Sequence, residues 1–435
     1  MTLTSDDEQL LLQLLCLDTS TPMETMRPGQ LVAAQHTYAQ AAARLGFTMV
    51  HHSPAPTSSL EDVLVRGPGQ SAAEATDFDF LDAQPNLVLS LGQGSGENVI
   101  VLNFHMDTVS GHVPVRRELG DIYGRGAVDD KGPGVAFLAA VRSALVRKPD
   151  LGDHIRVLLH VVGGEEGGAM GVYGTKSLAE LGYLGRLNIV AEPTGNAFLD
   201  RSSASMTLCL RASGQGSIDD APEAGENATV LLGYMAVWLS RHVIPAIHEA
   251  GGTVCVAGLH TGNAHNRVYG SGTLKINIAY GDTSTAQKAE SLISREVSAA
   301  LKAFTEEFAQ HPVLAATAKA AERMITVEWV KRGLPTLNNR DPVMEGLMAA
   351  SGFARHGEED PTALRPFTCD AIWLQDVGRY TVVCGPGNLV ANGAHTESEY
   401  IGISDLADYA SRLAELLVRF ADRAVKSAQS PRSHQ

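Results

Sequence analysis

Glu165 and Glu166 stand side by side in a glycine-rich segment, residues 163–168, directly after an apolar run at residues 155–162. The apolar run is typical of a buried strand, so both carboxylates are expected where that strand ends in a loop. Adjacent carboxylates repel each other unless a cation lies between them, and the flanking glycines let the backbone approach a bound ion closely. One carboxylate can then bind a metal ion while its neighbour transfers a proton. The alternative is a solvated acidic turn, which four other segments argue against.

A histidine and an aspartate follow a second apolar run. His105 comes directly after residues 99–104, which are predicted to form a strand, and Asp107 lies two residues further on. Residues two apart on a strand face the same way, so the Asp107 carboxylate is predicted to hold the His105 ring and raise its basicity as a metal ligand. The alternative for His105 alone is a histidine that caps the end of a strand.

Three further residues have side chains suited to metal binding. Asp129 lies among the glycines of residues 124–132, a setting in which one carboxylate can bridge two ions. Glu192 ends the apolar run at residues 187–191, and the proline after it keeps its backbone extended. His395 stands in a glycine-containing loop before the last predicted helix.

Together these residues form a donor set for metal ions. Two imidazoles and three carboxylates suit two borderline divalent ions such as zinc, each with a histidine, its own carboxylate and a share of a bridging one. All lie at loop ends, consistent with one edge of one sheet, where ligands bind in α/β folds. Asp130, next to the bridging candidate, can be simply an exposed turn residue. The candidate ligands are His105, Asp129, Glu166, Glu192 and His395.

The elements that must position these residues alternate between strands and helices in residues 1–200 and again in residues 333–435. Such alternation predicts an α/β domain, with a mixed, mostly parallel sheet flanked by helices. Residues 201–332 instead show strand-helix-strand-strand-helix-strand, typical of a small α+β sandwich. The sequence therefore predicts a catalytic domain with a smaller domain inserted into it.

Three long helices are also predicted. They cover residues 228–249, residues 285–310 with Ser284 as the N-cap, and residues 403–425. The polar tail after residue 425 is expected to fray.

The 435-residue chain has an ordinary globular composition, a net charge of −15 and a pI near 5.4. This charge argues against nucleic acid as a partner. No apolar run reaches the roughly 18 residues of a membrane span, and the acidic start at residues 1–8 is unlike a secretory signal. Five scattered cysteines without paired spacing suit a reducing compartment. A cytoplasmic protein without a membrane partner is expected.

The chain resembles the di-zinc aminoacylase and carboxypeptidase family, which includes acetylornithine deacetylase, succinyl-diaminopimelate desuccinylase and the glutamate carboxypeptidases. The matching segments keep the family's order and approximate spacing over most of the larger domain. They are His105-Met106-Asp107, residues 124–132, Glu165-Glu166, Ala191-Glu192-Pro193-Thr194, and Gly385-Pro386-Gly387 leading to Ala394-His395. The resemblance implies that the inserted domain serves as a lid and as a possible homodimer interface.

The resemblance also implies which residues share an ion. His105 and Glu192 would hold one zinc ion, and Glu166 and His395 the other. Asp129 would bridge the two, and the peptide bond that follows this residue is typically cis in the family. Two ions per chain are implied, with Co²⁺ or Mn²⁺ as possible substitutes.

Glu165 would be the general base of the implied reaction, and Asp107 the carboxylate that orients His105. Two ions about 3.5–4 Å apart lower the pKa of a bridging water and polarise a scissile carbonyl. Glu165 would take the proton of that water and pass it to the departing amine. An amide bond is the natural target.

The predicted lid departs from the family at two positions. Ile218 stands where relatives usually carry a histidine that stabilises the tetrahedral oxyanion, and Ala279 stands where relatives often carry an arginine. His260 or His265 is a possible substitute for the histidine, although either can be an ordinary polar residue of the lid.

Two lid residues are candidates for substrate contact. Asn266 resembles the family's substrate-binding asparagine, and Arg267 can replace the missing arginine through its forked guanidinium, unless it is simply a solvated arginine. The lid also carries a group of acidic residues that favours a substrate with a cationic amine, if they are more than a solvated loop. These residues are Asp219, Asp220, Glu223 and Glu226.

The sequence therefore predicts a di-zinc hydrolase that cleaves the amide bond of an N-acyl amino acid or small peptide. It does not separate a deacylase from a dipeptidase or carboxypeptidase. A contrasting hypothesis is a non-catalytic metal-binding relative that lost turnover with the lid histidine. Glu165 argues against this hypothesis, because a pure binding protein has no use for a general base.

Overall fold

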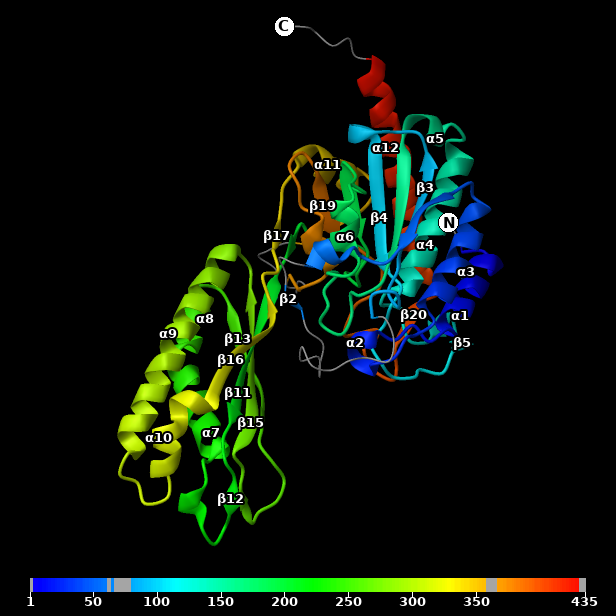
Figure 1. Ribbon diagram of the computed structural model, residues 1–435. Coiled ribbons are helices and arrows are strands. Elements are labelled where there is room, and N and C mark those ends of the chain that lie inside the picture. The colour runs from blue at the N-terminus through cyan, green and yellow to red at the C-terminus, as the bar shows by residue number, and fades with distance from the viewer. Residues whose placement is uncertain (1–2, 61–63, 66–79, 357–365, 430–435) are drawn as a thin grey trace, which may run out of the picture. The chain divides into compact units, whose positions relative to one another are not determined.

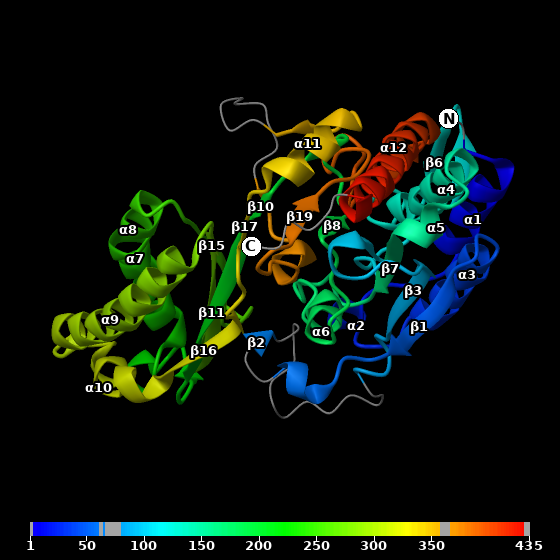
Figure 2. The same cartoon turned by 90° about the horizontal axis from the view of Figure 1, so that it is seen from above.

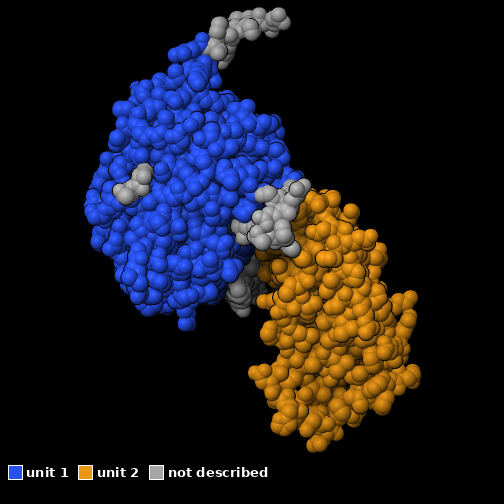
Figure 3. Space-filling view, turned by 180° about the vertical axis from the view of Figure 1, so that it is seen from behind, with its two compact units in different colours: residues 1–61, 67–202, 337–435 blue, residues 62–66, 203–336 orange. Residues whose placement is uncertain are grey.

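The computed structural model describes residues 3–60, 64–65, 80–356 and 366–429. The chain forms two compact units, drawn in separate colours in Figure 3. Unit 1 comprises residues 1–61, 67–202 and 337–435, and unit 2 comprises residues 62–66 and 203–336. The predicted boundaries after residues 200 and 332 lie close to two of these divisions, but the sequence predicts residues 62–66 to be part of the larger domain. The difference arises because β2 (Leu64–Val65) pairs with a strand of unit 2, and a two-residue strand has no readable periodicity.

Unit 1 is built on a six-stranded mixed sheet (Figure 1). Its strands, in spatial order, are β1 (Thr48–Ser53), β3 (Asn86–Gly92), β7 (Arg156–Val162), β4 (Val99–His105), β8 (Leu187–Val190) and β19 (Tyr380–Val383). The pairs β7–β4, β4–β8 and β8–β19 are parallel, whereas β1–β3 and β3–β7 are antiparallel. The predicted α/β class with a mixed, mostly parallel sheet is confirmed.

Both faces of this sheet are covered by helices, and β4 shows why. Ile100, Leu102 and Phe104 belong to the large apolar core on one face, whereas Val99 and Val101 belong to a smaller cluster on the other. Alternation with a period of two turns successive apolar side chains to opposite faces. Figures 1 and 2 show α4 and α12 on one side of the sheet and α6 on the other. The helices of unit 1 are α1 (Ser5–Leu15), α2 (Pro22–Thr25), α3 (Leu31–Ala43), α4 (Lys131–Arg147), α5 (Leu151–His154), α6 (Thr175–Glu180), α11 (Pro342–Ala350) and α12 (Ile403–Gln429).

Short strands complete unit 1. β5 (Arg116–Glu118), β6 (Asp121–Tyr123) and β20 (Tyr400–Gly402) form a three-stranded sheet. Two-stranded pairs join β9 (Ala197–Phe198) to β18 (Ala354–Arg355) and β10 (Arg201–Ser202) to β17 (Leu337–Asn338). The last helix, α12, runs to Gln429, so residues 426–429 of the tail expected to fray are helical. The rest of that tail lies outside the described residues.

Unit 2 is an antiparallel sheet with helices, as expected for an α+β sandwich. Its strands, in spatial order, are β13 (Thr253–His260), β15 (Ser271–Tyr280), β11 (Ala204–Ser213), β16 (Ile325–Arg332) and β2. Its helices are α7 (Ala228–His242), α8 (Ile244–Glu249), α9 (Thr283–Phe308) and α10 (Ala315–Met324). A separate pair joins β12 (Ser217–Ile218) to β14 (Arg267–Val268). The N-cap of α9 is Asp282 rather than Ser284, because the Asp282 side chain accepts a hydrogen bond from the Thr285 N–H at 2.9 Å.

The predicted helix over residues 228–249 is two helices that meet at Val243, two residues before Pro245. Within the described residues, this 22-residue stretch, with mean hydropathy 1.4, is long and apolar enough to cross a membrane by length and composition. That finding corrects the expectation that no segment is apolar enough. It is weak evidence for a span, because core helices pass the same test and Leu231, Met235 and Ile247 are buried within unit 2.

Candidate metal centre

The candidate ligands gather where three parallel strands of unit 1 end. His105 is the last residue of β4, Glu166 follows β7 in the next loop, and Glu192 comes just after β8. Because neighbouring parallel strands end at the same edge of a sheet, these side chains meet there. Loops from two other regions bring in Asp129 and His395, so all five predicted ligands come together.

Asp129 lies at the middle of this group. Its Oδ1 is 2.9 Å from His105 Nε2, and its Oδ2 is 3.1 Å from His395 Nε2. His395 Nε2 is also 3.1 Å from Glu166 Oε1. The two carboxylate oxygens of Asp129 therefore face different histidines. The peptide bond after Asp129 is cis, as the resemblance implied.

Two three-residue clusters share Asp129. In each cluster, one potential ligand atom per residue lies within 4.8 Å of the others. One cluster is His105, Asp129 and Glu192, and the other is Asp129, Glu166 and His395. This spacing and this mix of imidazole and carboxylate donors fit two divalent cations with one shared ligand. All are buried except His395, whose side chain is 49% exposed.

The centre concentrates negative charge. Within the described part of the chain, no lysine or arginine forms an ion pair with Asp129, Glu165, Glu166 or Glu192. Burial, and then nearby carboxylates, raise the pKa of Glu165 and of Glu192 well above the ordinary range. Burial likewise raises the pKa of Glu166, to about 7. Bound cations would remove this cost, because opposite charge favours the ionised carboxylates.

The pKa values of His105 and His395 are also raised, but for an imidazole this favours the charged form. Hydrogen bonds with Asp129 and Glu166 raise the pKa of His395 to about 11. Burial alone would raise the pKa of Asp129, but hydrogen bonds from His105 and His395 lower it below its usual range. Without metal, protons on the imidazoles therefore occupy the positions that cations would take.

These pKa shifts predict how the stability of the metal-free protein depends on pH. The pKa of Glu166 is raised from 4.5 to about 7, so its protonation stabilises the fold below pH 4.5, and this stabilisation is lost as the pH rises towards 7. The contribution of His395, whose pKa rises from 6.5 to about 11, is also lost with rising pH. We expect the free energy of unfolding of chelator-treated protein, and with it the Tm, to fall between pH 5 and pH 8. The Glu166 contribution is at most about 1.4 kcal/mol per pH unit, and the contribution of the half-exposed His395 is smaller because solvent screens it.

Calorimetry with and without zinc measures this dependence. Zinc should remove the fall, because it binds the deprotonated ligands. Glu166→Gln should flatten the metal-free profile, whereas Glu249→Gln, at an exposed site on α8, should not change it. An unchanged slope in Glu166→Gln would contradict the assignment of the titrating group.

Asp107 is placed differently from the prediction. Its Oδ1 is 3.8 Å from His105 Nδ1, too far for a hydrogen bond, and that nitrogen lies 2.9 Å from the Asp107 backbone oxygen. The carboxylate instead accepts hydrogen bonds from the backbone N–H groups of Glu165 at 3.3 Å and Glu166 at 3.1 Å. Asp107 therefore orients the glutamate loop through its side chain and the His105 ring through its backbone.

A segment that has no signal in the sequence packs on the loop that follows Glu165 and Glu166. The Trp373 Nε1–H donates to the Met170 backbone oxygen at 2.7 Å, and a Cβ at Gly171 would lie 2.3 Å from the Asp370 Cβ. Asp370 also accepts a hydrogen bond from the Thr175 hydroxyl. These residues come from a 3-10 helix, Asp370–Trp373, that no sequence pattern connects to the loop.

Asp130 is also placed differently from an exposed turn residue. Its side chain is fully buried at the start of α4, and both of its carboxylate oxygens lack a hydrogen-bond partner among the described residues. Burial raises the pKa of Asp130 well above the ordinary range. A protonated side chain fits this position, because an unpaired buried charge is costly.

The predicted substrate-binding residues, Asn266 and Arg267, lie in unit 2 and are exposed. Arg267 is paired with Ile218 across β12 and β14, so it neighbours the residue that stands at the lid-histidine position. The role of both residues in substrate binding stays a prediction.

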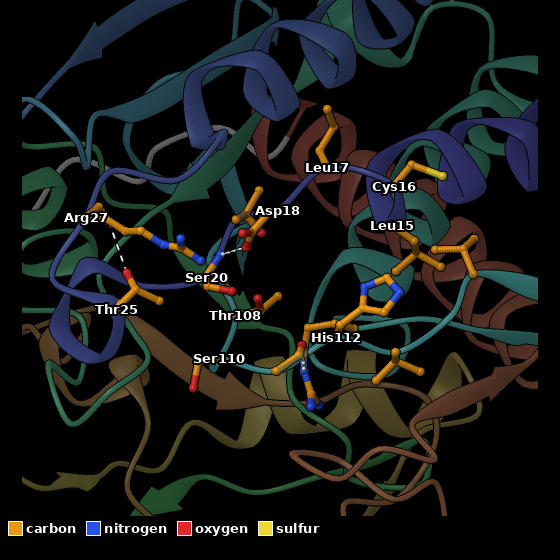
Figure 4. Close-up of a pocket in the computed structure, with 15 residues that line it drawn as sticks. Leu15, Cys16, Leu17, Asp18, Ser20, Thr25, Arg27, Thr108, Ser110 and His112 are labelled. Carbon is orange, nitrogen blue, oxygen red and sulfur yellow. Dashed lines mark hydrogen bonds between the residues drawn. The ribbon is translucent and has the colours of Figure 1, made fainter.

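A cavity of about 510 Å³ lies within unit 1 (Figure 4). Leu15 and His112 lie on one side of it, and Arg27 and Ser20 on the other. None of the predicted ligands lines it, so it is separate from the metal centre. Arg125 is part of its wall.

Comparison with known proteins identifies the family. Residues 101–419 match the profile of peptidase family M20/M25/M40, a span that contains every gathered ligand. The chain belongs to this family. The resemblance found in the sequence is thereby confirmed, and membership implies use of a divalent metal.

Several curated proteins are similar to parts of the chain. A LysW-lysine/LysW-ornithine hydrolase from Sulfurisphaera tokodaii is 25% identical over 374 residues, 83% of this chain and 95% of that protein. A putative LysW-lysine/LysW-ornithine hydrolase from Pyrobaculum aerophilum is 62% identical over 48 residues, and the match covers only 11% of this chain and 14% of that protein. A probable succinyl-diaminopimelate desuccinylase from Staphylococcus aureus is 31% identical over 154 residues, 33% of this chain and 37% of that protein.

Solved structures share the fold. A tripeptidase from Staphylococcus aureus has a TM-score of 0.66 at 18% identity, covering 97% of this chain and 100% of that one. An M20 family metallo-carboxypeptidase from Sulfolobus solfataricus has a TM-score of 0.66 at 14% identity, and the match covers 96% of this chain and 100% of that one. At these identities the likeness concerns the fold.

Proposed function

We propose that the protein is a metal-dependent hydrolase that cleaves the amide bond of an N-acyl amino acid or small peptide. The observation that carries this proposal is the pair of clusters that share Asp129, with Glu165 beside them. We propose two zinc ions per chain, because paired imidazole and carboxylate ligands suit zinc, with Co²⁺ or Mn²⁺ as substitutes.

Each residue of the centre would have a distinct task. A bound pair of divalent ions supplies positive charge that polarises a scissile carbonyl and acidifies water. The two clusters would hold one ion each, with Asp129 shared. Glu165, whose carboxylate lies within 4.8 Å of ligand atoms of His105 and Glu166, would take a proton from water and deliver it to the departing amine. Asp107 would keep Glu165 in place through its hydrogen bond to the backbone.

A substrate panel tests this function. Relatives are named as hydrolases of LysW-lysine or LysW-ornithine, as a desuccinylase, as a tripeptidase and as a metallo-carboxypeptidase. The panel should therefore contain N-acetyl and N-succinyl amino acids, dipeptides and tripeptides. Zinc-loaded protein should hydrolyse at least one class, a chelator should abolish the activity and zinc should restore it. Two bound zinc ions without turnover of any member would favour the non-catalytic alternative.

We further propose a preference for substrates with a cationic amine. Asp219, Asp220 and Glu223 are exposed in unit 2, whereas Glu226 pairs with Arg323. We expect kcat/KM for an N-acyl-lysine to exceed that for an N-acyl-glutamate about tenfold at low salt. The acidic side chains attract the cationic amine of the lysine substrate and repel the extra carboxylate of the glutamate substrate. The double variant Asp219→Asn, Asp220→Asn should narrow this ratio. Equal values in the unmodified protein would contradict the preference.

We also propose a homodimer formed through unit 2. β13 is an edge strand of its sheet, and Val256 and Leu259 on it are 40% and 38% exposed. An exposed apolar edge strand favours pairing with a second chain. Light scattering that shows a monomer at micromolar concentration would contradict this proposal.

A cytoplasmic location is proposed on the basis of the cysteines. All five cysteines are free, and Cys16 and Cys255 are exposed. Exposed free thiols fit a reducing compartment. Recovery of the protein only in an extracytoplasmic fraction of its source cells would contradict this location.

A further inference from the structure

Glu399 is a buried carboxylate that contacts the backbone of the Asp129 loop and belongs to neither ligand cluster. Its Oε2 accepts a hydrogen bond from Arg125 Nη1 at 2.6 Å. Its Oε1 accepts from the backbone N–H groups of Gly126 at 2.9 Å, Val128 at 3.3 Å and Asp129 at 3.4 Å. A guanidinium and three amides directed at one carboxylate form a built anion site, here occupied by a side chain.

This carboxylate joins two loops that carry candidate ligands. Glu399 lies four residues after His395, and its backbone oxygen also accepts the Gly124 N–H at 3.2 Å. The side chain therefore fixes the loop that carries Asp129 to the loop that carries His395. His395 depends on such support, because its side chain is 49% exposed and its backbone has a φ of +63°.

The other ligands are held differently. His105 ends β4 and Glu192 lies just after β8, and these parallel strands are joined by sheet hydrogen bonds. Asp129 and His395 lie outside the described strands and helices, so their separation depends on contacts between loops. Asp129 and His395 occur together in the cluster with Glu166, so this cluster is the one that should respond to a change at Glu399.

We propose that Glu399 and Arg125 are positioning residues that set the affinity of the ion bound by Asp129, Glu166 and His395. Neither residue belongs to that cluster, and both act through the backbone of the Asp129 loop. The inference rests on the proposed two-ion centre.

Glu399→Gln is the first test. Glutamine keeps an oxygen for the loop amides but directs an NH₂ group at Arg125, so the ion pair is lost with little change of shape. In calorimetric titration of the metal-free protein with zinc, we expect one ion to bind within threefold of its original affinity. The other should bind at least tenfold more weakly. The absorption spectrum of the protein loaded with two equivalents of Co²⁺ should lose the contribution of the weakened site.

Glu118→Gln is the matched control. Glu118 also pairs with an arginine, Arg116, at 3.3 Å, but its side chain is 56% exposed. Exposed pairs contribute little, so both ions should bind as in the unmodified protein.

Arg125→Ala gives a second test, and its result distinguishes positioning through the ion pair from a merely structural role. Arg125 lines the 510 Å³ cavity and pairs with Glu399, so we expect an added guanidinium ion to reach the Glu399 carboxylate from the cavity when the arginine side chain is removed. Arg125→Ala should weaken the same ion at least tenfold, and millimolar guanidinium should restore most of the loss. Tetramethylammonium at equal ionic strength should not, because it has no N–H donors.

The possible results separate the inference from the proposed function. The inference would be overturned if Glu399→Gln bound both ions as the unmodified protein does. It would also be overturned if both ions were weakened equally and guanidinium did not rescue Arg125→Ala. Failure of the unmodified protein to bind two ions would overturn the proposed function and this inference together.

Discussion

Glu165→Gln is expected to lower kcat about 10³-fold while KM and zinc content stay within a few-fold of the original values. Glutamine has the same shape but cannot accept a proton. Glu165 belongs to neither cluster that shares Asp129, and its hydrogen bond to Asp107 comes from the backbone, so the substitution leaves both clusters and the loop intact. Steady-state kinetics on the best substrate of the panel, with metal analysis of the same samples, measures the effect.

The matched control is Glu249→Gln, which changes an exposed glutamate on α8 and should leave kcat unchanged. The kcat–pH profile gives an independent measurement, since removal of a general base should flatten its acidic limb. A loss of less than tenfold with full zinc content would show that another group takes the proton.

Asp129→Ala is expected to lose both ions and to lower kcat/KM by about 10⁴-fold or more. Asp129 is the only residue common to both clusters, and its two oxygens lie at 2.9 Å and 3.1 Å from different histidines. Without this carboxylate each ion loses a ligand and the neutralising charge between the two sites. Zinc titration followed by calorimetry, with circular dichroism to verify folding, measures the loss.

Two comparison variants make this result specific. Asp129→Asn keeps one acceptor oxygen and should retain one ion, whereas His395→Ala should lose only the ion of its own cluster. Asp153→Asn, at an exposed site on α5, should bind both ions normally. Retention of two tightly bound ions by Asp129→Ala would contradict the shared-ligand assignment.

Local sequence patterns predicted most of the candidate ligands of the centre. Apolar runs followed by polar residues placed His105, Glu166 and Glu192 after strands β4, β7 and β8. Because parallel strands end at a common edge, their convergence followed once the α/β class was recognised. The same reasoning predicted that Asp107 lies at the centre. It did not predict the contacts that the Asp107 carboxylate makes.

Other features depended on contacts between distant parts of the chain. Arg125 and Glu399 are 274 residues apart, and Thr175 and Asp370 are 195 apart. A single acidic residue in a loop has no periodicity, so nothing local distinguishes Glu399 from its exposed neighbour Glu397. Helix limits show the same difficulty, since the N-cap of α9 depends on which of two neighbouring side chains, Asp282 or Ser284, meets the Thr285 N–H.

The sequence alone thus determined the class of fold, the family and the ligand types, because strand ends, glycine loops and donor chemistry are local properties. Only the tertiary structure decided which carboxylate oxygen faces which histidine, why Asp130 is buried, and that Glu399 joins two ligand loops. These features follow from packing of segments far apart in the chain, and the free energy of such contacts depends on geometry that no short stretch of residues contains.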